Sequence, residues 1–312
     1  MQISTYKTFT YLIVIITYTV VIYKLITYDE YTLLLQHLTS NTTKHWIFLF
    51  GAIILMPFNI LAESIKWKYA IHHIEKISLK KAIISTLKGQ VGAIATPNKF
   101  GDFPTRALSL QYGNKSIATI MGFISAWTLT LVITTIGISA SIIYISKYYT
   151  SLLSNQYLII SSTICLIILI SIFSLPTIAK KININNTNIK KGLFFLSKIT
   201  KKELLTLTFL SLLRYIIFCS QLTLMFLFFD INISLSQASI SIPIIYLLTT
   251  ITPTIIISEA TTRSSYAILI LTPLGYSTTP TIILATTLLW TLNCMIPAIT
   301  GSILFNKKYL KI

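Results

Sequence analysis

The chain has 312 residues, of which 54% are hydrophobic and only 11% are charged, and its mean hydropathy is +0.76. A soluble domain carries about 25% charged residues, so this composition excludes a soluble domain and indicates an integral membrane protein. The formal net charge of +17 comes mainly from lysines in short loops between apolar runs. That placement is typical of the cytoplasmic loops of membrane proteins and argues against a nucleic-acid partner.

Hydropathy predicts an all-α integral membrane protein, a single domain over residues 1–312 with six transmembrane spans. The apolar runs reach the length of about 18 residues or more that a spanning helix needs. No small-residue cleavage pattern follows the first run, so we interpret it as a retained span and not as a signal peptide. The predicted spans cover residues 6–27, 45–65, 116–146, 157–176, 203–229 and 278–305.

Two apolar helices, 79–95 and 234–251, are too short or too polar to cross a membrane comfortably, and we expect each to be re-entrant. Each is followed by a break and then by a short helix that ends near Leu110 or Leu271. Proline cannot continue a helix, so Pro97 and Pro253 are predicted to end the first helix of each pair. Both breaks read Thr-Pro, a spacer, an acid, three residues and Arg.

The lysines indicate the orientation of the chain. They gather in the regions 66–81, 177–202 and 307–311, whereas the regions 28–44, 147–156 and 230–277 hold few. Short-loop lysines and arginines stay in the cytoplasm. We therefore expect a multi-pass protein of the cytoplasmic (inner) membrane with both termini in the cytoplasm.

An internal duplication links the two breaks. Ile-Ser-Leu-x-x-Ala begins at Ile77 and at Ile233, and its alanine stands 14 residues before each Thr-Pro. Trp-Thr-Leu follows at Trp127 and at Trp290. The shared order and spacing predict two repeats, 6–150 and 156–306. Because the two re-entrant pairs enter from opposite sides, the repeats would be inverted, a design in which transporters place their site at the repeat interface.

We expect the three arginines to be charged residues in the interior of this apolar protein. Arg106 and Arg263 lie in the breaks, and Arg214 lies near the middle of the fifth span. Arginine is always charged and offers a planar fork of donors to phosphate or carboxylate. The pattern indicates a buried site for an anionic group, and we expect that group to be a lipid phosphate.

The acids leave two interpretations open. Asp102 precedes Arg106, and Glu259 precedes Arg263, by four residues, so each pair can neutralise itself along its own helix. Both acids can also stabilise a helix N-terminus, or bind a cationic head group. Arg214 has no acid one turn away, and Asp102 and Glu259 are its candidate partners.

Other residues are expected to have ordinary roles. Glu63 is interpreted as interfacial, and His72 and His73 as solvated. The sequence has three cysteines without paired spacing, and no metal-ligand spacing, nucleotide-binding glycine loop or nucleophile motif. We therefore expect no metal, no cofactor and no catalytic residue.

The two motifs support a family resemblance. The first contains Pro97, Gly101, Asp102 and Arg106, and a second Pro…Glu-x-x-x-Arg follows late in the chain. This pattern, over roughly residues 10–305, resembles the flippase-like transmembrane domain of lysylphosphatidylglycerol synthases. That family has Glu where this chain has Asp102, and Gly beside its second Glu where this chain has Ala260.

The resemblance implies translocation of a lipid, such as an aminoacylated phosphatidylglycerol, across the cytoplasmic membrane. In that family the synthase activity resides in a separate C-terminal soluble domain. The 312 residues include no such domain, so we expect no aminoacyl transfer and no enzymatic activity.

The leading hypothesis is therefore a lipid flippase that works by alternating access on an anionic or aminoacylated phospholipid. Two rivals stay open: a membrane enzyme or accessory protein of polyprenyl-phosphate or envelope-glycan metabolism, in which the acids act as general base or metal ligands, and a scaffold for a partner synthase. A homo-oligomer also stays open. The predicted substrate-binding residues are Asp102, Arg106, Arg214, Glu259 and Arg263.

Overall fold

The computed structural model describes most of the chain between residues 43 and 309, and every element in that part is helical. Four of its helices are long and apolar enough to cross a membrane, in agreement with four of the six predicted spans. The predicted span 6–27 and Pro253 lie outside the described residues, and so does all of the predicted span 157–176 except residues 163 and 174. The structure describes residues 43–94, 96–149, 197–252, 256–276 and 279–309, together with residues 32, 163, 174, 177, 179–181, 194 and 195.

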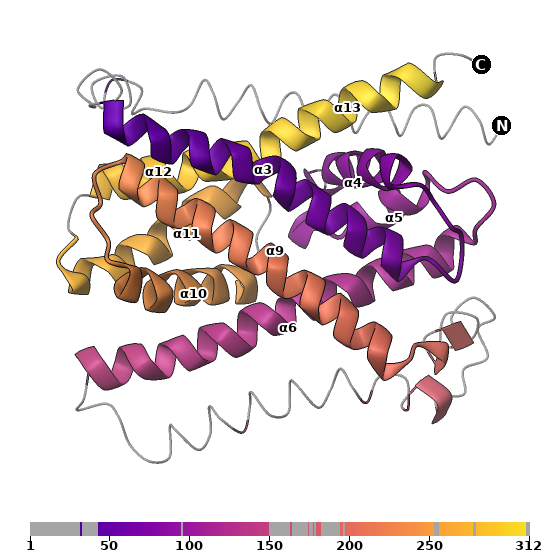
Figure 1. The fold of residues 1–312 in the computed structure, drawn as a ribbon, viewed down its shortest axis with the longest axis horizontal. Helices are drawn as coiled ribbons and strands as arrows, with labels where there is room; N and C mark the ends of the chain where they lie inside the picture. The colour runs from indigo at the N-terminus through magenta and orange to yellow at the C-terminus, as the bar shows by residue number, and fades with distance from the viewer. Residues whose placement is uncertain are drawn as a thin grey trace.

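The long helices run side by side (Figure 1). They are α3 (Thr43–Ala70), α6 (Lys115–Tyr148), α9 (Lys201–Phe228) and a final segment of three parts. That segment consists of α12 (Thr279–Trp290), the π-helical turn η4 (Thr291–Met295) and α13 (Ile296–Tyr309). Helix α3 continues past the predicted end of its span at residue 65, because no glycine or proline interrupts its last turns. Lys66 and Lys68, which were predicted to lie in the following loop, therefore belong to the helix.

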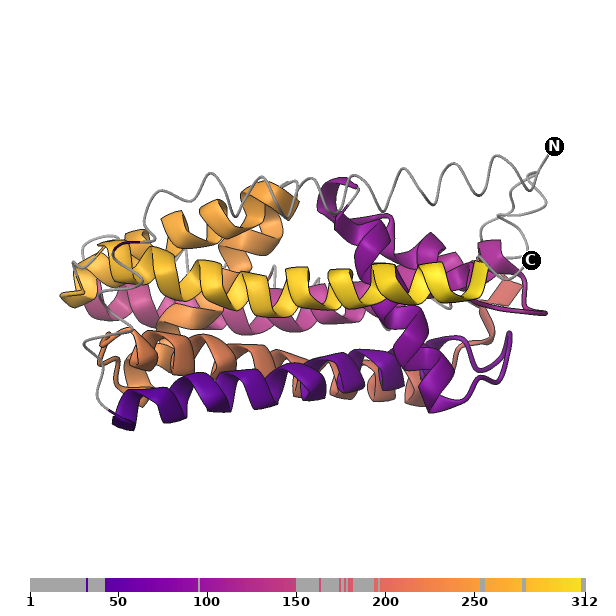
Figure 2. The same cartoon turned by 90° about the horizontal axis from the view of Figure 1, so that it is seen from above.

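Both predicted short-helix pairs are present. The first consists of α4 (Leu79–Ile94), the turn η1 (Pro97–Lys99) and α5 (Asp102–Ala107). The second consists of α10 (Leu235–Ile251) and α11 (Ile256–Leu271), followed by the turn η3 (Thr272–Leu274). The pairs lie toward opposite ends of the long helices, the first at the right and the second at the left in both views (Figure 1 and Figure 2).

The repeated Ile-Ser-Leu motif has the same structural role in both pairs. Ser78 Oγ accepts the backbone N–H of Lys81 at 3.3 Å, and Ser234 Oγ accepts that of Gln237 at 3.2 Å. Each serine thereby satisfies a backbone donor in the first turn of its short helix, as a helix N-cap does. The tryptophans of the repeat differ, since Trp127 is 51% exposed and Trp290 is 1% exposed.

Two glycines bring the halves of the chain into close contact. A Cβ at Gly137 on α6 would lie 3.0 Å from the carbonyl oxygen of Pro243 on α10, and one at Gly301 on α13 would lie 2.0 Å from that of Leu87 on α4. The last span of each half thus packs tightly against the first short helix of the other half. This reciprocity is what two repeats related by a two-fold axis would produce, and the repeat relation itself stays a prediction.

Candidate functional site

The predicted site residues lie on three helices and are mostly buried. Asp102 and Arg106 lie on α5, Arg214 on α9, and Glu259 and Arg263 on α11. All except Arg214 are less than 9% exposed, and the side chain of Arg214 is 21% exposed. Charged groups at this depth need partners, because moving an unpaired charge out of water is strongly unfavourable.

The two local pairs form as ion pairs. Arg106 Nε donates to Asp102 Oδ1 at 2.5 Å, and a second, parallel contact joins Nη2 to Oδ2. Arg263 Nη2 donates to Glu259 Oε1 at 2.6 Å. The four-residue spacing places each acid one turn before its arginine, which is the favourable order along a helix.

The partner of Arg214 is Glu63, which corrects two expectations. Arg214 Nη1 lies 2.7 Å from Glu63 Oε2, while Glu63 Oε1 accepts Arg106 Nη1 at 2.6 Å. Neither Asp102 nor Glu259 is an ion-pair partner of Arg214 among the described residues. Glu63 is 5% exposed and is enclosed by basic side chains, and α3 continues for nearly two turns beyond it. One carboxylate therefore joins a short helix of the first half to a span of the second.

A buried lysine completes this first cluster. The side chain of Lys66 is fully buried, and its Nζ lies 3.5 Å from Glu63 Oε2 and 3.2 Å from Ser211 Oγ. Ser211 Oγ in turn lies 2.8 Å from Thr128 Oγ1 on α6. A lysine at this position in an apolar span would otherwise be unfavourable, so the cluster explains why α3 can carry it.

Amides extend the cluster toward the last span. Arg214 Nε donates to Asn59 Oδ1 at 2.9 Å, and Asn59 Nδ2 lies 3.4 Å from Asn293 Oδ1. Asn293 Nδ2 donates to Gln221 Oε1 at 2.9 Å, and Gln221 Nε2 donates to the Ala52 carbonyl at 3.0 Å. Asn293 lies in the π-helical turn η4, a type of turn that is frequent at functional sites. A continuous polar line therefore crosses three otherwise apolar spans.

The second cluster joins the two breaks directly. Lys99, in the turn that follows α4, places its Nζ 2.9 Å from Oε2 of Glu259 on α11. The backbone of Asn98 and Lys99 is left-handed, with φ of 49° and 61°. That region is uncommon for residues other than glycine and costs about 1 kcal/mol or more per residue. The strained turn directs Lys99 across to the second half.

Arg263 retains an unsatisfied donor. Its guanidinium carbon lies 5.3 Å from the centre of the Tyr246 ring, a cation–π distance. Among the described residues its buried Nε has no hydrogen-bond partner. Buried donors without a partner are rare in folded proteins, and one at a polar site is a place where a ligand oxygen can bind.

Glycines allow the first acid–arginine pair to lie against α4. A Cβ at Gly89 would lie 2.0 Å from Asp102 Oδ1, and one at Gly92 would lie 2.4 Å from the Gly101 carbonyl oxygen. Gly101 is equally close, since its Cβ would lie 2.3 Å from the Gly92 carbonyl oxygen. The predicted motif glycine therefore serves close helix packing, and it fixes the position of Asp102.

Together the two clusters carry an excess of positive charge. Among the described residues five basic side chains face three acidic ones, so the pairs do not neutralise the site and two positive charges remain. The basic residues are Lys66, Lys99, Arg106, Arg214 and Arg263, and the acidic residues are Glu63, Asp102 and Glu259.

Comparison with known families matches residues 10–301 to the lysylphosphatidylglycerol synthase TM region. The chain belongs to this family. It is accordingly a multi-pass membrane protein linked to lipid metabolism or transport. Comparison with curated proteins and with solved structures found no match in either case.

For this member of the lysylphosphatidylglycerol synthase TM family, sequence reasoning missed three charged residues of the site. Glu63 and Lys66 share one face of α3 with Asn59, at positions i, i+4 and i+7. A polar stripe at that spacing on an apolar span was the available signal. Lys99 gave no comparable signal, because its partner Glu259 lies 160 residues away.

Proposed function

We propose that this protein moves an anionic or aminoacylated phospholipid across the cytoplasmic membrane by alternating access. The observation that carries the proposal is the excess of two positive charges in clusters whose acids and most of whose basic groups are buried, with Lys99 40% and Arg214 21% exposed. A charge that the described residues do not balance is balanced best by a bound counter-ion. A phospholipid supplies such an ion in its phosphate, and it arrives within the membrane plane.

Arg214 and Arg263 are the residues that we assign to the lipid phosphate. Arg214 is the most exposed of the three arginines and uses Nε and Nη1 for Asn59 and Glu63. Arg263 has its Nε without a partner among the described residues. Guanidinium groups bind phosphate through paired N–H donors. Glu259 then holds Arg263 in place, and Glu63 holds Arg214 beside Arg106. Asp102 and Glu259 balance the arginines or receive a cationic head group.

Alternating access is supported by the way the halves meet. The Lys99–Glu259 ion pair connects the two breaks, and Glu63 connects Arg106 of the first half with Arg214 of the second. Helices of the two halves also pack closely against each other, so the ion pairs are the contacts that a lipid phosphate can exchange. Their exchange for lipid phosphate would loosen the contacts between the breaks and let one half shift against the other. We also propose that both termini lie in the cytoplasm.

The rival enzymatic function receives less support from the geometry. A general base or metal ligand needs a carboxylate that is accessible to its target. Glu63, Asp102 and Glu259 each already accept at least one short contact from an arginine. We therefore infer transport and no enzymatic turnover, with a phospholipid as the partner and a separate synthase as the source of any aminoacylated lipid.

The test is lipid movement in vesicles reconstituted with purified protein. Fluorescent phosphatidylglycerol and phosphatidylcholine are incorporated separately, and the label that becomes accessible to an outside quencher is measured. Wild-type protein is expected to move the anionic lipid faster. The Arg214→Gln, Arg263→Gln double variant is expected to lose most of this movement. It should still fold, because Glu63 keeps Arg106 and Lys66, and Glu259 keeps Lys99.

The matched control is Lys68→Gln, which removes an exposed positive charge from α3. Its lipid movement is expected to equal that of the wild type. Unchanged movement in a double variant that elutes as a folded, monodisperse protein would refute the assignment of the two arginines. Equal transport of both lipids by the wild type would refute selection by the net charge of the lipid.

A further inference from the structure

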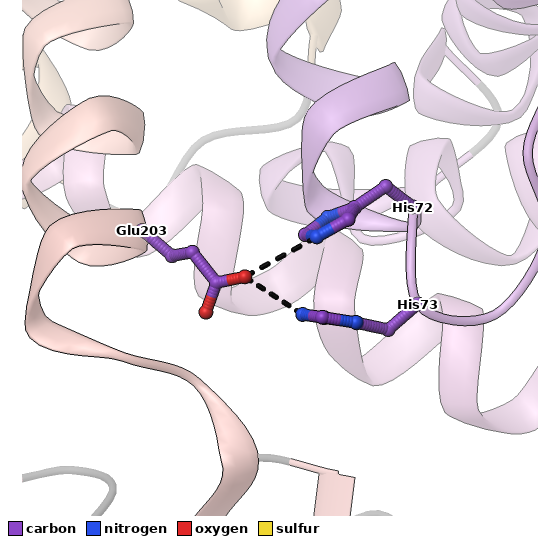
Figure 3. Close-up of side chains that lie close together, drawn as sticks. All are labelled: His72, His73 and Glu203. Carbon is purple, nitrogen blue, oxygen red and sulfur yellow. Dashed lines mark hydrogen bonds and ion pairs between the residues drawn. The ribbon is translucent and has the colours of Figure 1, made fainter.

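A cluster of two histidines and one glutamate lies outside both ionic clusters. His72 and His73 lie in the turn after α3, and Glu203 lies in the first turn of α9 (Figure 3). His72 Nε2 is 3.2 Å and His73 Nε2 is 2.7 Å from the same oxygen, Glu203 Oε1. The sequence could not indicate this group, because 130 residues separate His73 from Glu203.

The hydrogen bonds of His72 determine which of its nitrogens can bind a ligand. His72 Nδ1 is 2.6 Å from the backbone carbonyl oxygen of Tyr69. A carbonyl only accepts, so Nδ1 carries the proton and a neutral ring presents the lone pair of Nε2 to Glu203 Oε1. Two acceptors then face each other and need a cation between them. Metal-binding histidines typically make this backbone contact through their other nitrogen.

A proton on His72 Nε2 would be the alternative cation, while a neutral His73 donates its own Nε2–H to Glu203 Oε1. The rings of His72 and His73 lie with their centres only 3.8 Å apart. One divalent ion would serve both rings and the carboxylate at once.

Glu203 is held in the orientation that such a site needs. Its Oε2 accepts the backbone N–H of Thr200 at 2.7 Å and the Thr200 hydroxyl at 3.0 Å, within the capping box of α9. The other oxygen, Oε1, therefore points at the histidines. The side chain of Glu203 is 15% exposed, whereas those of His72 and His73 are 36% and 47% exposed. The group is thus fixed at its base and open to water on its outer side.

We propose that His72 Nε2, His73 Nε2 and Glu203 Oε1 bind Zn²⁺, with water as the fourth ligand. Two imidazoles, a carboxylate and a water form an established tetrahedral donor set for this ion. Zn–N and Zn–O bonds of roughly 2.1 Å place tetrahedral ligand atoms about 3.4 Å apart. The 3.2 Å contact of His72 already matches that separation, and the more exposed His73 needs only a small rotation.

The ion would join the end of α3 to the start of α9. These helices carry Glu63 and Arg214, so the site would hold in register the two helices that form the first ionic cluster. The proposal concerns a site separate from the lipid-binding residues, and its test does not depend on lipid transport.

The experiment measures metal binding by the full chain in detergent, purified with a tag that contains no histidine. Zn²⁺ binding is followed by calorimetry at neutral pH, and Co²⁺ is used as a visible-absorbance probe of tetrahedral coordination. Wild-type protein is expected to bind one Zn²⁺ per chain and to unfold at higher temperature with it. His72→Ala, His73→Ala and Glu203→Gln are each expected to weaken binding by about tenfold or more.

Two features make the test decisive. Glu203→Gln keeps the capping box, since glutamine also serves there, so its loss of binding cannot come from a frayed helix. His45→Ala is the matched control, because His45 lies at the other end of α3, about 40 Å from His72 at 1.5 Å per residue, and it should bind like the wild type. Absence of Zn²⁺ binding by the wild type, or equal affinity in a His72→Ala, His73→Ala double variant, would overturn the proposal.

Discussion

Glu63 is the residue whose replacement tests the first ionic cluster most directly. Glu63→Gln keeps the side-chain volume but removes the charge that faces Arg106, Arg214 and Lys66 at 2.6, 2.7 and 3.5 Å. Asp102 alone would then face three basic groups. Breaking a buried ion pair by removing one partner costs about 3–5 kcal/mol.

The structure indicates that the cost of Glu63→Gln lies at the lower end of that range. Arg106 keeps Asp102, Lys66 keeps the Ser211 hydroxyl, and Arg214 keeps Asn59 and is 21% exposed to water. We therefore expect Glu63→Gln to lower the free energy of unfolding by about 3 kcal/mol. Arg214→Gln alone removes one charged hydrogen-bond partner of Glu63 and should cost about 1.5–3 kcal/mol.

The assay is reversible unfolding in mixed micelles, driven by a denaturing detergent and followed by the loss of helix signal. A double-variant cycle over Glu63→Gln and Arg214→Gln should show that the double variant loses at least about 1 kcal/mol less than the sum of the single losses, because both remove the same contact. Lys68→Gln, on the exposed side of α3, should stay within about 0.5 kcal/mol of the wild type. Wild-type stability of Glu63→Gln, or strict additivity in the cycle, would refute the ion-pair geometry.

Three further predictions concern helix packing and the loop after α3. Gly92→Ala should lower stability by about 1–3 kcal/mol, because its Cβ would lie 2.1 Å from Thr105 Oγ1, and a thermal melt that matches the wild type would contradict it. Gly301→Ala should be at least as costly, since its Cβ would meet the rigid Leu87 carbonyl at 2.0 Å, and the same melt measures it. Although burial favours the neutral acid, hydrogen bonds from a lysine and two backbone N–H groups lower the pKa of Glu75 from 4.5 to about 2. Its contribution to stability is therefore complete above pH 4.5 and is lost as the pH falls toward 2. Glu75→Gln should abolish this loss of stability at low pH in thermal melts recorded as a function of pH. A pH dependence equal to that of the wild type would contradict the prediction.

The helices could be predicted from the sequence because the membrane restricts the alternatives. Every backbone group in lipid must be bonded within its own helix, so apolar runs and proline breaks determine most boundaries. The predicted helices 79–95 and 234–251 correspond to α4 and α10 within one residue at each end. The predicted end of the second span at residue 65 was wrong because hydropathy falls there although α3 continues. The helix continues because lysine and glutamate are good helix formers.

The site could be predicted only where its contacts are local. Asp102 with Arg106 and Glu259 with Arg263 lie one helical turn apart, so spacing alone indicates them. The Glu63–Arg214 contact joins residues 151 positions apart, and it depends on how α3 and α9 pack lengthwise. A shift of one helix by a single turn would move Arg214 about 5.4 Å from its partner, and the sequence of neither helix specifies that alignment.

The ionic clusters are difficult to explain as stabilising elements alone. Apolar side chains of similar volume often stabilise a protein as well as a buried ion pair does, and they would insert into a membrane more easily. A purely structural network would also balance its charges, whereas here five basic groups face three acids. The surplus is spread over both clusters, and Arg263 adds a buried donor without a protein partner among the described residues. An anion that comes from outside the chain satisfies the charge and the donor together, which is why we propose lipid phosphate as the ligand of Arg214 and Arg263.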